Sequence, residues 1–419
     1  MAAVLWAFLQ TGEGTVSPKH PYQAGGRGFT KGRQTGTDRE GKHDTMYSGW
    51  KRIMKDSYSF KQFFQYVYRK EGQKFVRPEK GKEEMEEWQR KFRSELSEQL
   101  GLNRLSRLAD GFPASAIHLE DSRQEEGYLR QKIVMRTLPF VEMPFYVLIP
   151  DGVNAANPAR AMLTFPAHGA NKNTVCGVAE TPEEAEKIKS TPDECYGREF
   201  ARRGYMVFCP DPPGYGESAE PMPSEDSSFL PDQKKSSLAS SCKDLAQTAE
   251  ALGLSLTALK LWEMRCLLDF ACARPEVAKG EAGHPRIGCA GFSGGGADSM
   301  WLAAMDERIR LAVISGYIHG YYDSILECHL CPCNYAPSLW LLGDISDICA
   351  LIAPRPLFAE NGTEDVENGP CGITGPVSQM ERVRRAYALF EASDAAEHRT
   401  PDGIHRWYGE CYSFADRML

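Results

Sequence analysis

The spacing of apolar side chains predicts helices in the first quarter of the chain. Between residues 47 and 107, five large apolar side chains recur at intervals of three and four in an otherwise charged segment: Met85, Trp88, Phe92, Leu96 and Leu100. This spacing places them on one face of a helix, and Gly101 follows at the position of a C-terminal cap. We expect a helical layer that packs against a core.

Farther along, short apolar segments alternate with helical ones. The expected strands are residues 128–138, 143–150, 161–169, 205–211, 286–291, 309–317 and 354–362. The expected helices are residues 194–204, 236–275, 294–306 and 377–392. Strands that are apolar throughout need cover on both faces, which is typical of a parallel sheet. The pattern therefore predicts an α/β fold with a mostly parallel central sheet and helices on both faces, whose chemistry lies beyond the C-terminal ends of the strands.

Composition and charge narrow the classes of partner. Of the 419 residues, 57 are acidic and 49 basic, for a formal net charge of −8. This balance argues against nucleic acid or an anionic membrane as the partner, and no segment approaches the ~18 apolar residues of a membrane span. The thirteen cysteines lack the spacing of a disulfide framework, and the first residues lack the features of a signal peptide. We expect a cytoplasmic protein with reduced thiols that acts on a small molecule, and association into a homo-oligomer stays open.

One motif carries the chemistry. Gly291-Phe292-Ser293-Gly294-Gly295 fits G-x-S-x-G and lies between an expected strand and an expected helix. This is the context of a nucleophile elbow, in which small residues let the strand and helix approach each other around a strained serine. The phosphate-binding patterns G-x-x-x-x-G-K-[ST] and G-x-G-x-x-G are not matched here. A glycine-rich turn without function is the remaining alternative.

Two other segments fit a role in stabilising a developing oxyanion. The helix that follows Ser293 would direct the amide of Gly294 toward negative charge. A second amide is expected in the turn after the strand that ends near residue 165, at Gly169 or Ala170. His168, in the same turn, is expected to fix the turn rather than to act as a base.

Asp365 and His405 complete the order serine, acid, histidine along the chain, which is the order expected for this motif. His405 would take the proton of Ser293, and Asp365 would orient the imidazole. The acid is the least certain of the three, and its alternatives are Glu364, Glu367 and Asp347. His398 competes with His405, but it lies where a last strand would run.

Taken together, the motifs resemble those of the α/β-hydrolase superfamily, and more narrowly its dienelactone-hydrolase and acetyl-xylan-esterase-like group. The resemblance covers residues 84–419 and rests on "HGANKN", "YGREFARRGYMVFCPDPPGYGES", "GFSGGG", "CPCNYAP", "DICALIAPRPLFAENGTED" and "GIHRW". It implies a serine esterase with no cofactor and no metal that hydrolyses a small ester, such as an acetyl ester of a carbohydrate or metabolite. Dienelactone hydrolases use a cysteine nucleophile, whereas Ser293 favours ordinary ester hydrolysis. The alternatives are a serine peptidase or amidase, and a silent hydrolase-like binding protein.

Composition and apolar spacing divide the chain into parts. We expect a disordered extension at residues 1–45, a helical extension at 46–125 that packs on the core, and a catalytic domain at 126–419. Insertions at 219–254 and 317–343 follow strand ends, so they are expected to form the lid and walls of the pocket.

The second insertion contains aromatic and sulfur-containing side chains. Tyr321, Tyr322 and Trp340 could stack on a sugar ring or another flat substrate, as could Tyr335, and the alternative is that they pack the lid onto the core. Cys328, Cys331 and Cys333 lie close together with His329. Because no second pair of ligands follows at a zinc-finger spacing, we expect a structural turn there rather than a metal site.

Overall fold

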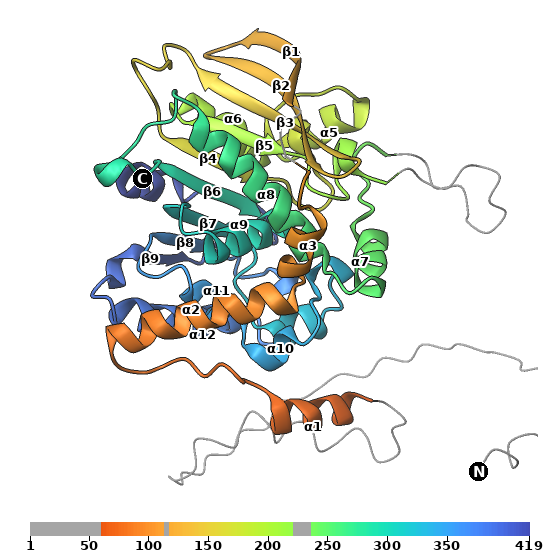
Figure 1. Cartoon of the computed structure of the whole chain (residues 1–419), viewed down its shortest axis with the longest axis vertical. Coiled ribbons are helices and arrows are strands. Elements are labelled where there is room, and N and C mark those ends of the chain that lie inside the picture. Colours follow the sequence, from red (N-terminus) through yellow and green to blue (C-terminus); the bar gives the residue numbers. More distant parts are fainter. Residues whose placement is uncertain (1–59, 113–116, 221–235) are drawn as a thin grey trace, which may run out of the picture. The chain divides into compact units, whose positions relative to one another are not determined.

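The computed structural model describes residues 60–112, 117–220 and 236–419 (Figure 1). The chain divides into one unit of residues 1–60 and a second of residues 61–419, and the second is described below. The expected disordered extension at 1–45 lies outside the described residues, as do residues 46–59 of the expected helical extension.

A nine-stranded sheet forms the centre of the fold, in the order β1-β2-β3-β5-β4-β6-β7-β8-β9. Its strands are β1 (Ile117–Glu125), β2 (Tyr128–Leu138), β3 (Val141–Pro150), β4 (Ala161–Phe165), β5 (Met206–Pro210), β6 (Ile287–Phe292), β7 (Leu311–Ser315), β8 (Leu357–Glu360) and β9 (Ala396–Arg399). The first three strands pair antiparallel with their neighbours, β3 is antiparallel to β5, and the other pairs are parallel. The predicted mostly parallel sheet is confirmed, with an antiparallel edge.

Strand β1 was not predicted, because residues up to 125 were assigned to the helical extension. Its sequence, IHLEDSRQE, is polar, and seven of its nine residues are exposed. This edge strand pairs only with β2, and neither of its faces packs on the core, so no apolar alternation is required. The assignment of 117–125 to a helical segment was therefore wrong.

Helices cover both faces of the sheet. They are α1 (Lys61–Glu71), α2 (Lys82–Gln99), α3 (Leu102–Leu108), α4 (Lys172–Val175), α5 (Pro182–Ser190), α6 (Tyr196–Arg202), α7 (Cys242–Ala251), α8 (Leu256–Ala273), α9 (Gly294–Met305), α10 (Leu339–Leu342), α11 (Ile345–Ala350), α12 (Thr374–Ala388) and α13 (Tyr412–Met418). Side chains of α2, α8, α9, α11 and α12 share one core cluster, whereas those of α6 and α13 belong to a second. Along β5, Met206 and Phe208 join the first cluster, and Val207 and Cys209 the second. Both faces of this central strand are therefore buried.

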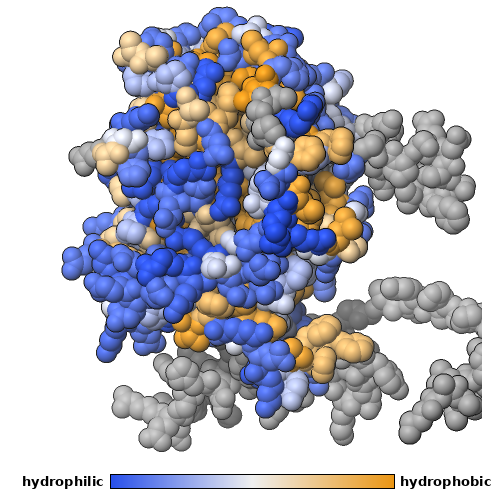
Figure 2. Space-filling model, in the orientation of Figure 1, coloured by the Kyte–Doolittle hydropathy of each residue, from blue (hydrophilic) through white to orange (hydrophobic). Residues whose placement is uncertain are grey.

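The predicted apolar face of α2 is confirmed. Met85, Trp88, Phe92 and Leu96 are buried and join the first core cluster. Much of the rest of the helix is charged, and hydrophilic side chains dominate the surface over this part of the molecule (Figure 2). None of the described helices is both long and apolar enough to cross a bilayer.

Candidate active site

Ser293 occupies a strained turn between β6 and α9. Its backbone has φ 54° and ψ −119°, a region that non-glycine residues adopt only where the surrounding structure holds them. Its amide donates to the carbonyl of Ser315 at the end of β7, at 2.9 Å. The predicted order of strand, turn and helix around this serine is confirmed.

Two glycines make this turn possible. A Cβ atom added to Gly291 would lie 2.2 Å from the carbonyl oxygen of Gly295, and one added to Gly295 would lie 1.9 Å from that of Phe165. Both distances are far below van der Waals contact, and the contacted atoms belong to the backbone. The glycines therefore allow β6, β4 and α9 to approach one another, as the sequence pattern predicted.

His405 and Asp365 are brought together from two loops. Asp365 follows β8, and His405 lies between β9 and α13. Nδ1 of His405 is 2.7 Å from Oδ2 of Asp365, while Oδ1 of Asp365 accepts a hydrogen bond from the amide of Glu367 at 2.8 Å. Because Asp365 is 5% exposed and held at both oxygens, it fixes the orientation of the imidazole.

Ser293 and His405 line the same cavity, of about 250 Å³. The other residues around it are Ala167, His168, Phe292, Gly294, Tyr317, Leu330, Cys331, Asn334 and Glu367. Nε2 of His405 is buried and makes no hydrogen bond within the described residues. It lies 3.6 Å from a carboxylate oxygen of Glu367. This nitrogen is thus available to exchange a proton with a group in the cavity.

The charges around His405 shift its proton affinity. Burial lowers the pKa of His405, but the hydrogen bond to Asp365 and the charges of Glu367 and Asp365 outweigh this effect and raise the pKa above its usual value. Burial also raises the pKa of Glu367, although His405 opposes that shift. The site therefore favours an imidazolium that is shared between two carboxyl groups.

Of the competing acids and histidine, all but Glu367 lie away from the cavity. Glu364 is exposed, and Asp347 forms ion pairs with Arg77 and Arg382. His398 lies on β9, with Nε2 3.2 Å from Oδ1 of Asn361. Of the alternatives, only Glu367 reaches the cavity, on the Nε2 side of the imidazole. Asp365 is the acid whose position fits the role assigned to it from the sequence.

The amides near Ser293 differ in part from the expected set. Gly294 begins α9 and lines the cavity, so its amide belongs to the first turn, which has no acceptor within the helix. In the turn after β4, Ala167 and His168 line the cavity, whereas Gly169 and Ala170 do not. The amide of Ala170 donates to the carbonyl of Ala167 at 3.1 Å. The assignment of Ala170 as an oxyanion donor is therefore wrong, because the turn itself uses this amide.

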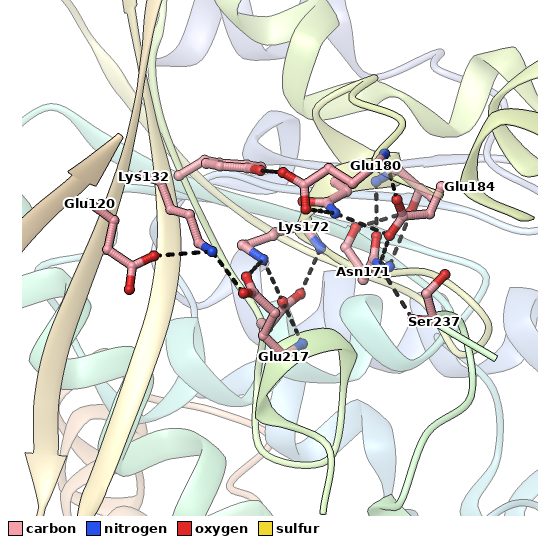
Figure 3. A network of polar contacts seen from close by, with 12 residues as sticks. Glu120, Lys132, Asn171, Lys172, Glu180, Glu184, Glu217 and Ser237 are labelled. Carbon is pink, nitrogen blue, oxygen red and sulfur yellow. Dashed lines mark hydrogen bonds and ion pairs between the residues drawn. The ribbon is translucent and has the colours of Figure 1, made fainter. Parts of the chain in front are cut away.

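A buried polar network holds this turn in place. Lys172, fully buried, donates through its backbone amide and its Nζ to the two carboxylate oxygens of Asp211, at 2.7 and 2.9 Å. Its Nζ also pairs with Glu217, which Lys132 contacts from β2 (Figure 3). The network links the segment after β4, which contributes Ala167 and His168 to the cavity, to the loop after β5.

The aromatic residues assigned to substrate binding lie outside this cavity. Tyr321 is buried in the first core cluster. Trp340 stacks on Tyr68 of α1 with ring centroids 4.0 Å apart, and on Tyr322 at 5.1 Å. Trp340 and Tyr322 therefore join α1 to the second insertion. The three aromatic side chains do not line this cavity, so their assignment to substrate binding there is wrong. The alternative interpretation, that they pack the insertion onto the rest of the protein, fits their contacts.

Other side chains at the site belong to no recognisable sequence motif and were not predicted as site residues. Tyr317 and Asn334 line the cavity, and the Tyr317 hydroxyl donates to Oδ1 of Asn334 at 2.7 Å. The buried hydroxyl of Tyr215 has no hydrogen-bond partner within the described residues, and a Cβ on Gly294 would lie 3.0 Å from it. Tyr215 lies in the proline- and glycine-rich loop "PDPPGYGES" after β5. Its position in a loop that follows a strand is the sequence feature that could have indicated a place near the site.

Comparison with known proteins shows the family of this chain. The model of the Abhydrolase family matches residues 63–321. "Putative hydrolase YtaP" of Bacillus subtilis (strain 168) is 26% identical over 275 residues, which cover 62% of this chain and 78% of that protein.

Solved structures share the fold. A "putative acetyl xylan esterase" from Bacteroides fragilis NCTC 9343 is 21% identical, with a TM-score of 0.65 over 82% of each chain. A glucuronoyl esterase from Solibacter usitatus is 14% identical, with a TM-score of 0.55 over 83% of this chain and 96% of that one. At these identities the likeness concerns the fold.

Proposed function

Because the chain belongs to the Abhydrolase family, we propose that it is a serine hydrolase that cleaves a small carboxylic ester through an acyl-enzyme on Ser293. The observation that carries this proposal is the position of His405. Its Nδ1 is held by Asp365 at 2.7 Å, while its Nε2 borders the cavity that Ser293 also lines. This is the relation that a nucleophile, a base and an orienting acid require.

In this mechanism, Oγ of Ser293 attacks the ester carbonyl carbon while Nε2 of His405 takes its proton. Asp365 stabilises the imidazolium that forms. The negative charge on the carbonyl oxygen is stabilised by the amide of Gly294 and by the turn at Ala167 and His168, each donor being worth ~2.7–4 kcal/mol. The alcohol leaves with the proton from His405, and a water molecule repeats the attack on the acyl-enzyme.

The dimensions and charge of the cavity support a small, uncharged acyl group. About 250 Å³ is below the ~300–1,000 Å³ of sites for drug-sized ligands. Glu367 places a carboxyl group on the wall beside His405, which disfavours an anionic acyl group. An acetyl ester of a carbohydrate or metabolite fits both features, and solved structures of the same fold are named as a "putative acetyl xylan esterase" and a glucuronoyl esterase.

Turnover of p-nitrophenyl esters of increasing chain length tests the proposal. The wild type is expected to hydrolyse the acetate with a higher kcat/KM than the octanoate, and Ser293→Ala to lose at least about 10⁴-fold in kcat. Ser299→Ala is the matched control, because Ser299 lies on the same helix and its buried hydroxyl has no partner within the described residues. No turnover of any ester by the folded wild type would overturn the proposal.

A further inference from the structure

Three thiols and one imidazole converge beside the cavity from separate parts of the chain. His168 follows β4, Cys242 begins α7, and Cys331 and Cys333 flank Pro332 in the second insertion. Their donor atoms all lie within 4.8 Å of one another. Cys242 and Cys333 are buried, with 1% and 8% exposure.

The distances fit a common ligand at the centre of the group. Nε2 of His168 is 3.4 Å from Sγ of Cys242 and 3.3 Å from Sγ of Cys333, and Sγ of Cys242 is 3.2 Å from that of Cys331. A tetrahedral zinc ion, with Zn–S about 2.3 Å and Zn–N about 2.0–2.1 Å, separates its ligand atoms by about 3.5–3.8 Å. The three observed separations are a few tenths of an ångström below these values, so the ligand atoms would move slightly apart around the ion.

Ordinary packing of thiols does not explain the arrangement as well. The in-plane lone pair of one imidazole nitrogen can accept a single hydrogen bond, yet two sulfur atoms contact Nε2 of His168 at nearly equal distances. None of the thirteen cysteines, all of which lie among the described residues, forms a disulfide. The 3.2 Å between the sulfurs of Cys242 and Cys331 is well beyond the about 2.05 Å of an S–S bond.

Polar groups around the sulfurs match those that surround metal thiolates. Oγ of Ser240 lies 3.3 Å from Sγ of Cys242, and Nδ2 of Asn334 donates toward Sγ of Cys333 at 3.6 Å. Such outer hydrogen bonds stabilise the charge of coordinated sulfur. We propose that His168, Cys242, Cys331 and Cys333 bind one Zn²⁺ ion.

The proposed site is structural in type, because four protein ligands leave no open position for substrate. It would join three segments, two of which line the cavity through His168 and Cys331. A Cβ on Gly294 would lie 2.8 Å from Nδ1 of His168, so the nitrogen that does not bind zinc lies against the first turn of α9. Zinc would therefore hold the wall of the cavity in position beside Ser293.

This proposal departs from the expectation of no metal. Cys328 and His329 lie close to Cys331 and Cys333 in the sequence, but they are outside the group of four donors. The missing ligands, His168 and Cys242, precede Cys333 and Cys331 by 165 and 89 residues. Only the tertiary structure brings them together.

Metal analysis of the full chain, purified without chelator after expression in zinc-supplemented medium, tests the proposal. We expect one zinc per chain, and the same content in Ser293→Ala, so that the result does not depend on the proposed esterase activity. After replacement of zinc by Co²⁺, the visible ligand-field bands of a tetrahedral site and a near-ultraviolet thiolate-to-cobalt band are expected. Zinc far below one per chain, or octahedral cobalt spectra, would overturn it.

Variants assign the ligands. Cys242→Ser and Cys333→Ser are expected to weaken zinc binding by more than the roughly 10–100-fold that loss of an outer-sphere partner costs. Cys328→Ser is the control, since it lies three residues from Cys331 outside the group, and it should keep its zinc. If the ligand variants do not fold, mercurial titration of the wild type replaces them, with release of one zinc expected. A Cys242–Cys331 disulfide in peptide maps of freshly purified, unreduced protein would contradict the proposal.

Discussion

Nδ1 of His405 lies 2.7 Å from Oδ2 of the buried Asp365, and the second oxygen of that carboxylate is held by the amide of Glu367. The acid is therefore fixed before it orients the imidazole. The His405–Asp365 pair assigns a separate role to each residue of the proposed mechanism, and each role can be tested by substitution.

Asp365→Asn is expected to lower kcat by roughly 10⁴-fold, because an amide at this position favours the wrong tautomer of the imidazole. Steady-state kinetics with p-nitrophenyl acetate measure the effect. Glu364→Gln is the control, since Glu364 is adjacent but exposed, and it should retain wild-type kinetics. The acid assignment fails if Glu364→Gln abolishes turnover while Asp365→Asn keeps it.

Glu367 is expected to set the pH dependence of the reaction. Neutral His405 is the base, so kcat/KM should rise with pH through the pKa of His405, which lies above its usual value. Removing the anionic charge in Glu367→Gln makes the imidazolium less stable, and the midpoint of the profile should move to lower pH by roughly one unit. An unchanged midpoint, or a shift to higher pH, would show that Glu367 does not act on His405.

Much of this fold was predictable from the sequence, because the central strands are apolar and glycines mark the turns. The predicted strand 128–138 coincides with β2, and the glycines around Ser293 lie where their missing side chains matter. Strand β1 escaped prediction because an exposed edge strand has no apolar pattern. Trp340 stacks on Tyr68 of α1, and Tyr322 accepts a hydrogen bond from Gln65 of the same helix. These contacts depend on how an insertion folds back, which local patterns do not encode.

Gly295→Ala should destabilise the fold as well as the site. The new Cβ would lie 1.9 Å from the carbonyl oxygen of Phe165, so backbone must move, with a cost of at least about 2 kcal/mol. Chemical denaturation should show a lower midpoint, and ester turnover should fall. Gly375→Ala is the control, because its nearest neighbour would be 3.5 Å away. Equal midpoints for Gly295→Ala and the wild type would contradict the close-approach argument.

Glu263 makes stability depend on pH away from the active site. Burial raises its pKa to about 7, although Thr137 donates a hydrogen bond that lowers it. Between its unfolded pKa and about 7 the unfolded chain binds fewer protons at this group, so wild-type stability falls as pH rises through that window and the loss persists above it. Glu263→Gln removes this loss, so its free energy of unfolding relative to wild type, measured by chemical denaturation at each pH, should increase from pH 5 to pH 8 by on the order of 3 kcal/mol at most. A difference that is constant with pH would show that Glu263 ionises normally.

The central claim is that Ser293 is the nucleophile, and covalent labelling tests it most directly. A fluorophosphonate probe should add once to the wild type, and peptide mapping by mass spectrometry should place the adduct on Ser293. Ser299→Ala should label as the wild type does, and Ser293→Ala should not label. An unlabelled but folded wild type, or an adduct at another residue, would contradict the account.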